Sequence, residues 1–218
     1  MKDTIESCGV PHTEIDLILV DGESVGFDHH LAGGERVAVY PVFEGLDISP
    51  VTRLRARPLR CPRFLVDANL GRLARLLRLL GFDTRYDQQM DDDVIAGIAA
   101  EEGLTILTRD RGLLMRRIVT RGYFVRSQAP RTQAAEVMRR FDLHEQVRTF
   151  TRCVDCNGLI QPVPKTEIQD RLPHNTRLFY DTFYRCSQCS KLFWRGAHWR
   201  NLQSLVDEIR STAAEDNG

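Results

Sequence analysis

The stretch from residue 63 to residue 114 alternates between short apolar runs and amphipathic segments, and this alternation constrains the fold more than any other feature. Apolar runs of strand length lie at residues 64–66 and 104–107, and leucines, isoleucines and alanines recur at helical spacing in residues 70–80 and 94–99. Strands that alternate with helices form parallel sheets, and buried parallel strands are apolar throughout. The stretch therefore predicts an α/β core built on a parallel sheet.

Acidic residues follow both predicted strands. Asp67 comes directly after the first, Asp110 shortly after the second, and Asp91, Asp92 and Asp93 open the helix between them. Ligands bind at the carboxyl ends of parallel strands, so these acids are expected at one edge of the sheet. Carboxylates about 4 Å apart repel by roughly 4 kcal/mol at an effective dielectric constant near 20, which indicates a bound cation. Oxygen ligands suit Mg²⁺ or Mn²⁺, which activate water for phosphodiester hydrolysis, although each Asp could instead be a helix N-cap.

Charge is distributed unevenly along a chain whose net charge is zero. Residues 1–50 carry ten acids and two bases, whereas residues 51–126 carry fifteen bases and nine acids. A basic region around a cluster of acids suits an enzyme that acts on a phosphate polymer. The chain has 27 arginines and three lysines, and a general bias towards arginine explains this equally well.

Three segments of the core carry a resemblance to a known family. The segments V-D-A-N-L-G, D-D-V-I-A-G-I-A-A-E-E-G-L and L-T-R-D-R-G-L-L resemble PIN-like nuclease domains, and more closely the Mut-seven C-terminal ribonuclease family. That family joins a zinc ribbon to a PIN-like core. The resemblance covers residues 61–212 and implies a three-layer core and a catalytic metal site formed by Asp67, Asp92 and Asp110, with Asp91 or Asp93 as alternatives to Asp92.

The same comparison implies residues that contact RNA. Asn69 and Arg72 are close to Asp67 in sequence, and Arg109 lies within the T-R-D segment. Arg72 is in register with Arg75 and Arg78 on the first predicted helix, so a solvated helix face remains an alternative. Gly112 occupies a position where PIN domains often carry a further acid, which favours the alternative of a non-catalytic RNA-binding module. A toxin-type ribonuclease fits the core but not the additional domains.

Two C-x-x-C motifs are the most specific local signal in the chain. Cys153 and Cys156 precede Asn157-Gly158, and Cys186 and Cys189 follow 29 residues later. Four thiolates at this spacing predict a closed, structural Zn²⁺ site in a zinc ribbon. A redox role is disfavoured, because there are two pairs and no thioredoxin-like pattern around them.

Aromatic residues and arginines follow the last cysteine in the segment K-L-F-W-R-G-A-H-W-R. Such side chains can stack on bases and pair with phosphates. The ribonuclease family has a similar W-x-G-x-H-W segment, so Trp194, Arg195, His198 and Trp199 are candidate RNA contacts. Packing of these aromatics between the ribbon and the core is the alternative.

Residues 1–50 predict a short helix followed by strands at E-I-D-L-I-L-V, S-V-G-F and V-A-V-Y-P-V-F. This resembles the second half of a ubiquitin-like (β-grasp) sulfur carrier, and therefore an incomplete domain. Gly33-Gly34 lies in a predicted turn rather than at a free end, so sulfur-carrier activity is not expected and an interaction with a protein partner is. The absence of an apolar leader or membrane-length segment predicts a cytoplasmic protein that does not bind membranes.

The sequence thus predicts an α/β chain with four parts: a partial ubiquitin-like domain in residues 1–50, a basic linker in 51–61, a PIN-like nuclease core in 62–150, and a zinc ribbon with a closing helix in 151–212. The expected activity is that of a metal-dependent ribonuclease, an endonuclease and hydrolase of phosphodiester bonds. The expected cofactors are structural Zn²⁺ and catalytic Mg²⁺ or Mn²⁺, and the expected partner is RNA.

Overall fold

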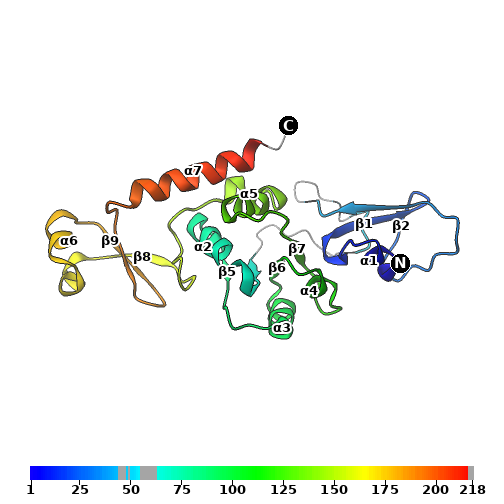
Figure 1. The fold of residues 1–218 in the computed structure, drawn as a ribbon, viewed down its shortest axis with the longest axis horizontal. Helices are drawn as coiled ribbons and strands as arrows, with labels where there is room; N and C mark the ends of the chain where they lie inside the picture. Colours follow the sequence, from blue (N-terminus) through cyan, green and yellow to red (C-terminus); the bar gives the residue numbers. More distant parts are fainter. Residues whose placement is uncertain (44–47, 49, 55–62, 216–218) are drawn as a thin grey trace. The chain divides into compact units, whose positions relative to one another are not determined.

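The computed structural model (Figure 1) describes residues 1–43, 48, 50–54 and 63–215. The chain is mixed α/β and divides into two compact units, each of which is described by itself. The first unit comprises residues 1–71, 86–126 and 140–142, and the second comprises residues 72–85, 127–139 and 143–218. Most of the predicted basic linker, including Cys61, lies outside the described residues.

The first unit contains three strands of a parallel sheet, in the order β4, β6, β7. They span Phe64–Val66, Thr105–Thr108 and Gly122–Phe124. Every residue of β4 and β6 is buried, as expected of parallel strands covered on both faces. Both strands predicted from the apolar runs are confirmed, the second with its start shifted by one residue.

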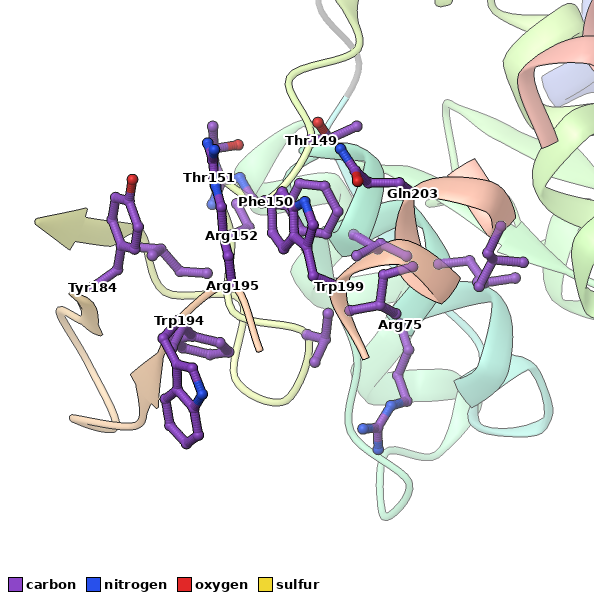
Figure 2. Close-up of a pocket in the computed structure, with 17 residues that line it drawn as sticks. Arg75, Thr149, Phe150, Thr151, Arg152, Tyr184, Trp194, Arg195, Trp199 and Gln203 are labelled. Carbon is purple, nitrogen blue, oxygen red and sulfur yellow. The ribbon is translucent and has the colours of Figure 1, made fainter. Parts of the chain in front are cut away.

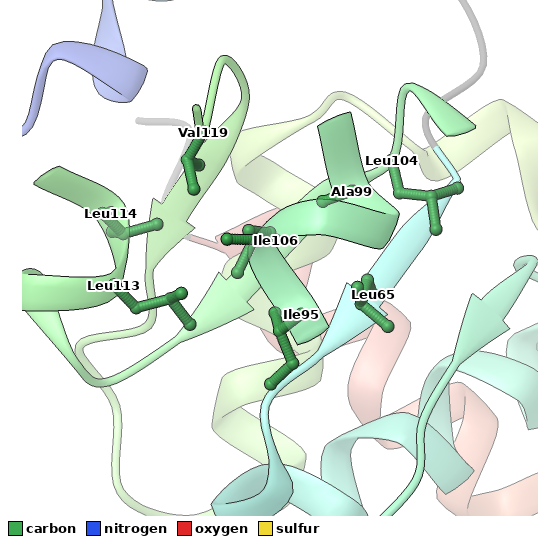
Figure 3. Close-up of a cluster of buried hydrophobic side chains, with 9 residues drawn as sticks. Leu65, Ile95, Ala99, Leu104, Ile106, Leu113, Leu114 and Val119 are labelled. Atoms are coloured by element: carbon green, nitrogen blue, oxygen red, sulfur yellow. The ribbon is translucent and has the colours of Figure 1, made fainter. Parts of the chain in front are cut away.

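Two helices cover one face of this sheet: α3 (Asp92–Glu102) and α4 (Arg111–Met115). Their apolar side chains meet those of β4 and β6 in the cluster drawn in Figure 3. In that cluster Ile95 of α3 and Leu113 of α4 are fully buried with Leu65 and Ile106 of the strands. This packing fixes where α3 and α4 begin, and both begin at predicted site residues.

The opposite face of the sheet carries aromatic side chains. The ring of Phe141 lies 5.4 Å from that of Phe64 and 5.9 Å from that of Tyr123, in edge-to-face arrangements. Such pairs add stabilisation beyond the apolar area that they bury. The sheet is therefore covered on both faces, and only its edge is left for ligands.

The N-terminal part of the first unit forms a second, antiparallel sheet in the order β2-β1-β3. Its elements are α1 (Lys2–Ser7), η1 (His12–Glu14), β1 (Ile15–Val20), β2 (Glu23–Ser24) and β3 (Val37–Pro41). The predicted strand S-V-G-F is wrong in its bounds, because β2 ends at Ser24 and only Val25 continues the pairing, through its N–H to the Ile18 carbonyl at 3.0 Å. Ile5, Ile15 and Ile18 form a small core beneath the sheet.

This N-terminal part covers the free edge of β7. Glu14 Oε1 accepts the backbone N–H of Phe124 at 2.6 Å, and Glu14 Oε2 lies 3.1 Å from the Arg126 guanidinium. His12 Nε2 lies 2.8 Å from the Val119 carbonyl oxygen. An uncovered strand edge invites pairing with other chains. The N-terminal part therefore stabilises the nuclease core directly.

Replacing Glu14 by Ala should destabilise the protein by about 2 kcal/mol, because it leaves the Phe124 N–H without its buried acceptor and removes the partner of Arg126. Urea unfolding followed by circular dichroism measures the change. Glu23→Ala is the matched control, since Glu23 is exposed on β2. Equal midpoints for both variants would contradict the role assigned to Glu14.

The second unit begins with most of α2 (Gly71–Leu80), which ends at Gly81 as predicted. Gly81 has φ of +99°, and a Cβ there would lie 2.1 Å from the Arg148 carbonyl oxygen. The Arg148 N–H in turn donates to the Leu80 carbonyl at 2.9 Å. The helix end is thus bound to the segment that leads into the cysteine-rich region.

That region is a three-stranded antiparallel sheet in the order β10-β9-β8 with a small core of Val163, Ile168, Leu172 and Phe183. The remaining elements of the chain are η2 (Ala68–Leu70), β5 (Thr84–Arg85), α5 (Pro130–Arg140), η3 (His144–Gln146), β8 (Ile160–Val163), η4 (Lys165–Glu167), η5 (Gln169–Arg171), α6 (His174–Phe179), β9 (Phe183–Cys186), β10 (Leu192–Phe193) and α7 (Trp199–Glu215). Helix α7 is longer than predicted, because residues 211–215 continue it rather than fray. No helix in the described part of the chain is long and apolar enough to cross a membrane.

Candidate functional site

Asp67 and Asp110 lie beyond the carboxyl ends of β4 and β6 and are linked through Thr108. The Thr108 hydroxyl donates to Asp67 Oδ2 at 2.7 Å and accepts the Asp110 N–H at 2.9 Å. Asp67 is 6% exposed, and Thr108 is fully buried. Thr108 was not among the predicted site residues, although it is the first residue of the T-R-D segment. Its hydroxyl fixes the Asp67 carboxylate relative to Asp110.

Each of these two acids also accepts a local backbone N–H. Asp67 Oδ1 accepts from Asn69 at 3.5 Å, and Asp110 Oδ1 accepts from Gly112 at 2.7 Å, at the start of α4. The capping alternative is therefore realised at both positions. It uses one oxygen of each carboxylate.

The three acids at the start of α3 have different environments. Asp91 is the N-cap, since its Oδ1 accepts the Val94 N–H at 2.9 Å. The Asp93 side chain is 88% exposed and pairs with Arg116. Partial burial raises the pKa of Asp92, the charges of Asp110 and Asp67 raise it further, and Arg116 lowers it. Asp92 is thus the member of this group that lies within the field of Asp67 and Asp110.

The spacing of the acids limits how an ion could bind. Among the described residues, Cys153, Cys156, Cys186 and Cys189 are the only set of three or more potential ligands whose donor atoms lie within 4.8 Å of one another. The three acids are therefore more widely spaced than a fully direct ligand set. This fits Mg²⁺, which usually keeps several waters and binds one or two carboxylates directly.

The four cysteines form a much tighter cluster. The sulfurs of Cys153 and Cys189 are 3.7 Å apart, and those of Cys156 and Cys186 are 3.3 Å apart. A tetrahedron of thiolates about 2.3 Å from Zn²⁺ has edges of about 3.8 Å. The four cysteines could therefore hold a zinc ion, as the spacing of the C-x-x-C motifs predicted.

Comparisons with known proteins agree with both halves of this arrangement. The family model described as Mut7-C RNAse domain matches residues 62–206, which is more than half of the chain. The chain belongs to the Mut7-C RNAse domain family. The model described as Mut7-C ubiquitin matches residues 1–47. Neither the comparison with curated proteins nor that with solved structures finds a match.

Membership of the Mut7-C family confirms the resemblance noted in the sequence, including its ubiquitin-like N-terminal part. The family description indicates a ribonuclease-type function. RNA is the partner that such a function implies.

The cysteine cluster of this Mut7-C chain is built from two turns with the same hydrogen bonds. Cys153 N–H donates to the Gly158 carbonyl and Asn157 N–H to the Cys153 carbonyl, at 2.8 and 2.9 Å. Cys186 pairs in the same way with Lys191 and Ser190, at 2.9 and 3.2 Å. A Cβ at Gly158 would lie 2.7 Å from Cys186 Sγ, so only glycine allows the two turns to approach so closely.

Hydrogen bonds within the first turn also favour a thiolate. Burial opposes ionisation of Cys156, but the Gly158 N–H and the neighbouring thiols stabilise the charged sulfur, and the pKa of Cys156 falls to about 7. Metal ligation by cysteine requires thiolates.

Arg78 supports the first turn, a role that the sequence did not suggest. Its side chain is 3% exposed, Nε donates to the Thr84 carbonyl at 2.8 Å, and Nη1 donates to the carbonyls of Val154 and Asp155 at 3.2 and 2.8 Å. Burial lowers the pKa of Arg78, and the neighbouring cysteine sulfurs raise it. Arg78 lies on neither a solvated helix face nor an RNA-binding row, the two alternatives for the predicted register with Arg72 and Arg75.

Arg78→Lys should destabilise the cysteine cluster by about 2 kcal/mol, because one ammonium group cannot reach all three carbonyls. The rate of zinc release to a chromogenic chelator measures this. Arg75→Lys is the matched control on the same helix, because Arg75 is 61% exposed and pairs with the partly exposed Asp155. Equal release rates for the two variants would show that Arg78 does not support the turn.

The predicted RNA contacts lie in several places. Asn69, Arg72 and Arg109 are exposed, and Arg109 Nη1 donates to the Arg126 carbonyl at 3.3 Å. Trp194, Arg195 and Trp199 line a groove of about 690 Å³ in the second unit, shown in Figure 2. His198 is exposed and lines a second hollow of about 610 Å³ that shares Trp194 and Trp199 with the first.

Proposed function

We propose that this Mut7-C chain is a metal-dependent ribonuclease, and that Asp67, Asp92 and Asp110 hold the Mg²⁺ or Mn²⁺ ion that it uses. The observation that carries this proposal is the raised pKa of Asp92, which reports the charges of Asp110 and Asp67 on a carboxyl group from a third segment. Like charges that come together in this way indicate a functional site.

The side chains around the acids prepare them for this role. Thr108 fixes Asp67 by donating to one of its oxygens, and Gly112 fixes one oxygen of Asp110. The remaining carboxylate oxygens are left to bind an ion directly or through water. A divalent ion held there supplies Lewis-acid activation of water and of the RNA phosphate.

Arg109 and Arg116 supply positive charge beside the acids. Arg109 is exposed and adjacent to Asp110, and Arg116 lies 3.7 Å from Asp92 Oδ2. Arginine binds phosphate well because its planar group donates two parallel hydrogen bonds. These residues, with Asn69 and Arg72, are proposed to position the RNA backbone.

The cysteine cluster is proposed to bind one structural Zn²⁺. Four thiolate ligands fill a tetrahedral site and leave no position for water or substrate, so this ion takes no part in the reaction. We also propose the domain limits 1–50, 51–61, 62–150 and 151–212, with the ribbon holding RNA through Trp194, Arg195, His198 and Trp199.

A non-catalytic RNA-binding module is the second candidate, and Gly112 favours it. A Cβ at Gly112 would lie 3.1 Å from Asp110 Oδ1, so a further acid fits poorly where PIN domains often carry one. An acid set that is smaller than usual could bind RNA without cleaving it.

Incubating the purified full chain with end-labelled RNA, with and without Mn²⁺, separates the two candidates. The ribonuclease proposal predicts internal cleavage products that appear only with Mn²⁺ or Mg²⁺. Intact RNA that remains bound under every metal condition would support the non-catalytic module, and equal cleavage without a divalent ion would exclude the metal mechanism.

A further inference from the structure

The largest described hollow of the second unit combines apolar walls with arginines. Its rim carries Arg75, Arg152 and Arg195, and its apolar walls include Leu76, Leu79 and Ile160. Among the described residues that line it, none is acidic. A volume of about 690 Å³ is within the usual range for sites that bind small ligands. The groove therefore suits a ligand that is both flat and apolar in one part and anionic in another.

Its aromatic side chains fall into two groups. The rings of Phe150 and Trp199 are stacked with centroids 4.0 Å apart, and the guanidinium of Arg195 lies 5.0 Å from the Trp199 ring. Both faces of Trp199 thus have partners, as Figure 2 illustrates for the overlapping rings. Trp194 and Tyr184 lie apart from this pair and are half-buried, so part of their surface is accessible.

The wall formed by Phe150 is fixed before any ligand binds. Phe150 has φ of +59°, a left-handed conformation that is unusual for a bulky residue. Its N–H donates to the Leu79 carbonyl at 3.1 Å, and the Thr151 hydroxyl donates to the Arg148 carbonyl at 2.6 Å. Backbone strain of this kind persists where the surroundings hold it, often at binding sites.

The arginines differ in how much they are already engaged. Arg152 donates to the Asn157 carbonyl at 3.0 Å and pairs with Asp83 at 3.2 Å, and it is 20% exposed. Arg75 is 61% exposed and pairs with Asp155 through Nη2 at 2.9 Å, whereas Arg195 is exposed over Trp199. Arg75 and Arg195 are therefore the better placed for phosphates.

We propose that this groove binds single-stranded RNA, with an unpaired base stacked on Trp194 and the neighbouring phosphates on Arg75 and Arg195. This rests on the proposed ribonuclease function and adds to it a preference for unpaired over duplex RNA. Bases in a duplex are stacked on one another and cannot enter such a hollow, whereas single-stranded bases can turn out onto aromatic rings.

The two tryptophans of the chain, Trp194 and Trp199, both line the groove, so intrinsic fluorescence reports on it alone. The test titrates the zinc-loaded full chain, without Mg²⁺ or Mn²⁺, with a labelled RNA of roughly 12 nucleotides, a common footprint for single-strand binders, and with the duplex of the same sequence. The single strand should bind at least about tenfold more tightly and quench the fluorescence. Trp194→Phe should remove most of the quenching, and Trp199→Phe should retain it.

Further variants test each contact. Trp194→Ala should weaken single-strand binding by about 10- to 100-fold, the effect of losing one stacked base. Arg195→Gln and Arg75→Gln should each reduce the salt dependence of binding by about 0.7 in logarithmic slope, the value for one phosphate contact. Arg210→Gln, which removes an exposed arginine of α7 outside the groove, should leave affinity and slope unchanged.

Duplex binding equal to single-strand binding, quenching that survives Trp194→Phe, or equal binding of polyglutamate would each overturn the proposal. Zinc content and circular dichroism identify any misfolded variant, and the arginine variants then decide the question. Cleavage assays on the same proteins keep the two proposals separate. Binding in the groove without Mn²⁺-dependent cleavage would contradict only the ribonuclease function, and cleavage without binding at Trp194 would contradict only the groove.

Discussion

Replacing Asp67 by Asn should lower the rate of Mn²⁺-dependent RNA cleavage by about 10³-fold, because an ion in a catalytic site contributes several kcal/mol to the barrier and each tenfold change corresponds to about 1.4 kcal/mol. Asp67 is the most buried of the three acids, at 6% exposure, and its carboxylate is fixed by Thr108. An amide of the same shape removes the charge that the ion requires. Initial rates on labelled RNA under single-turnover conditions measure the loss.

The fold should survive this substitution. The amide oxygen of Asn can accept the Asn69 N–H, and its NH₂ group can donate to the Thr108 hydroxyl, which already accepts the Asp110 N–H. The expected cost is about 1 kcal/mol, which a thermal melt detects without loss of the native state. Cleavage at the wild-type rate by a folded Asp67→Asn protein would remove the proposed site.

Two adjacent acids provide the matched pair for this experiment. Asp91→Asn should retain cleavage within about threefold, since Asn caps helices as well as Asp does and the Val94 N–H keeps its acceptor. Asp92→Asn should lose cleavage as Asp67→Asn does, because Asp92 is the residue within the field of the other two acids. The reverse result, with Asp91 essential and Asp92 dispensable, would assign the wrong residue to the site.

The comparison of Asp91 with Asp92 also shows what the sequence could establish. Apolar runs at 64–66 and 104–107 predicted β4 and β6 because a strand buried on both faces has one composition. Three consecutive acids, by contrast, all satisfy the same pattern at a helix start. Which of them caps the helix depends on where α3 begins, and packing of Ile95 against Leu65 determines that.

Arg78 and Trp199 show a second limit, because their partners are distant in sequence. Arg78 has the same helical spacing as two exposed arginines, but the carbonyls of Val154 and Asp155 bind it from beyond residue 150. Trp199 resembles a base-stacking residue in its motif, and only the position of Phe150 shows that its ring is already stacked. Local pattern predicts local structure, whereas the distinction between packing and binding depends on long-range contacts.

The cysteine cluster leads to the second large effect, which is the loss of zinc and of the folded ribbon in Cys186→Ser. Cys186 is 1% exposed, its sulfur lies 3.3 Å from that of Cys156, and the Gln188 N–H donates to it at 3.4 Å. Serine is a poor zinc ligand and would bury an unpaired hydroxyl among thiolates. Bound zinc should fall from about one per chain to near zero.

Loss of the ion should unfold the ribbon, because the ribbon has little else to hold it. Its own core consists of four buried apolar residues, Val163, Ile168, Leu172 and Phe183. Structural zinc contributes about 10–16 kcal/mol in small zinc modules, more than a core of this size can replace. Limited proteolysis with mass spectrometry should therefore detect rapid cleavage between residues 153 and 193, while β4, β6 and β7 in the other unit stay protected.

Cys8→Ser is the matched control, since Cys8 is exposed after α1 and lies outside the cluster. It should retain full zinc content and the wild-type pattern of proteolysis. If Cys186→Ser kept both its zinc and its resistance to protease, the ribbon would have to be held by its polar contacts alone. Those contacts are surface ion pairs such as that of Lys165 with Asp181, which contribute about 0–1 kcal/mol each, so the metal is the only term large enough to decide whether the ribbon folds.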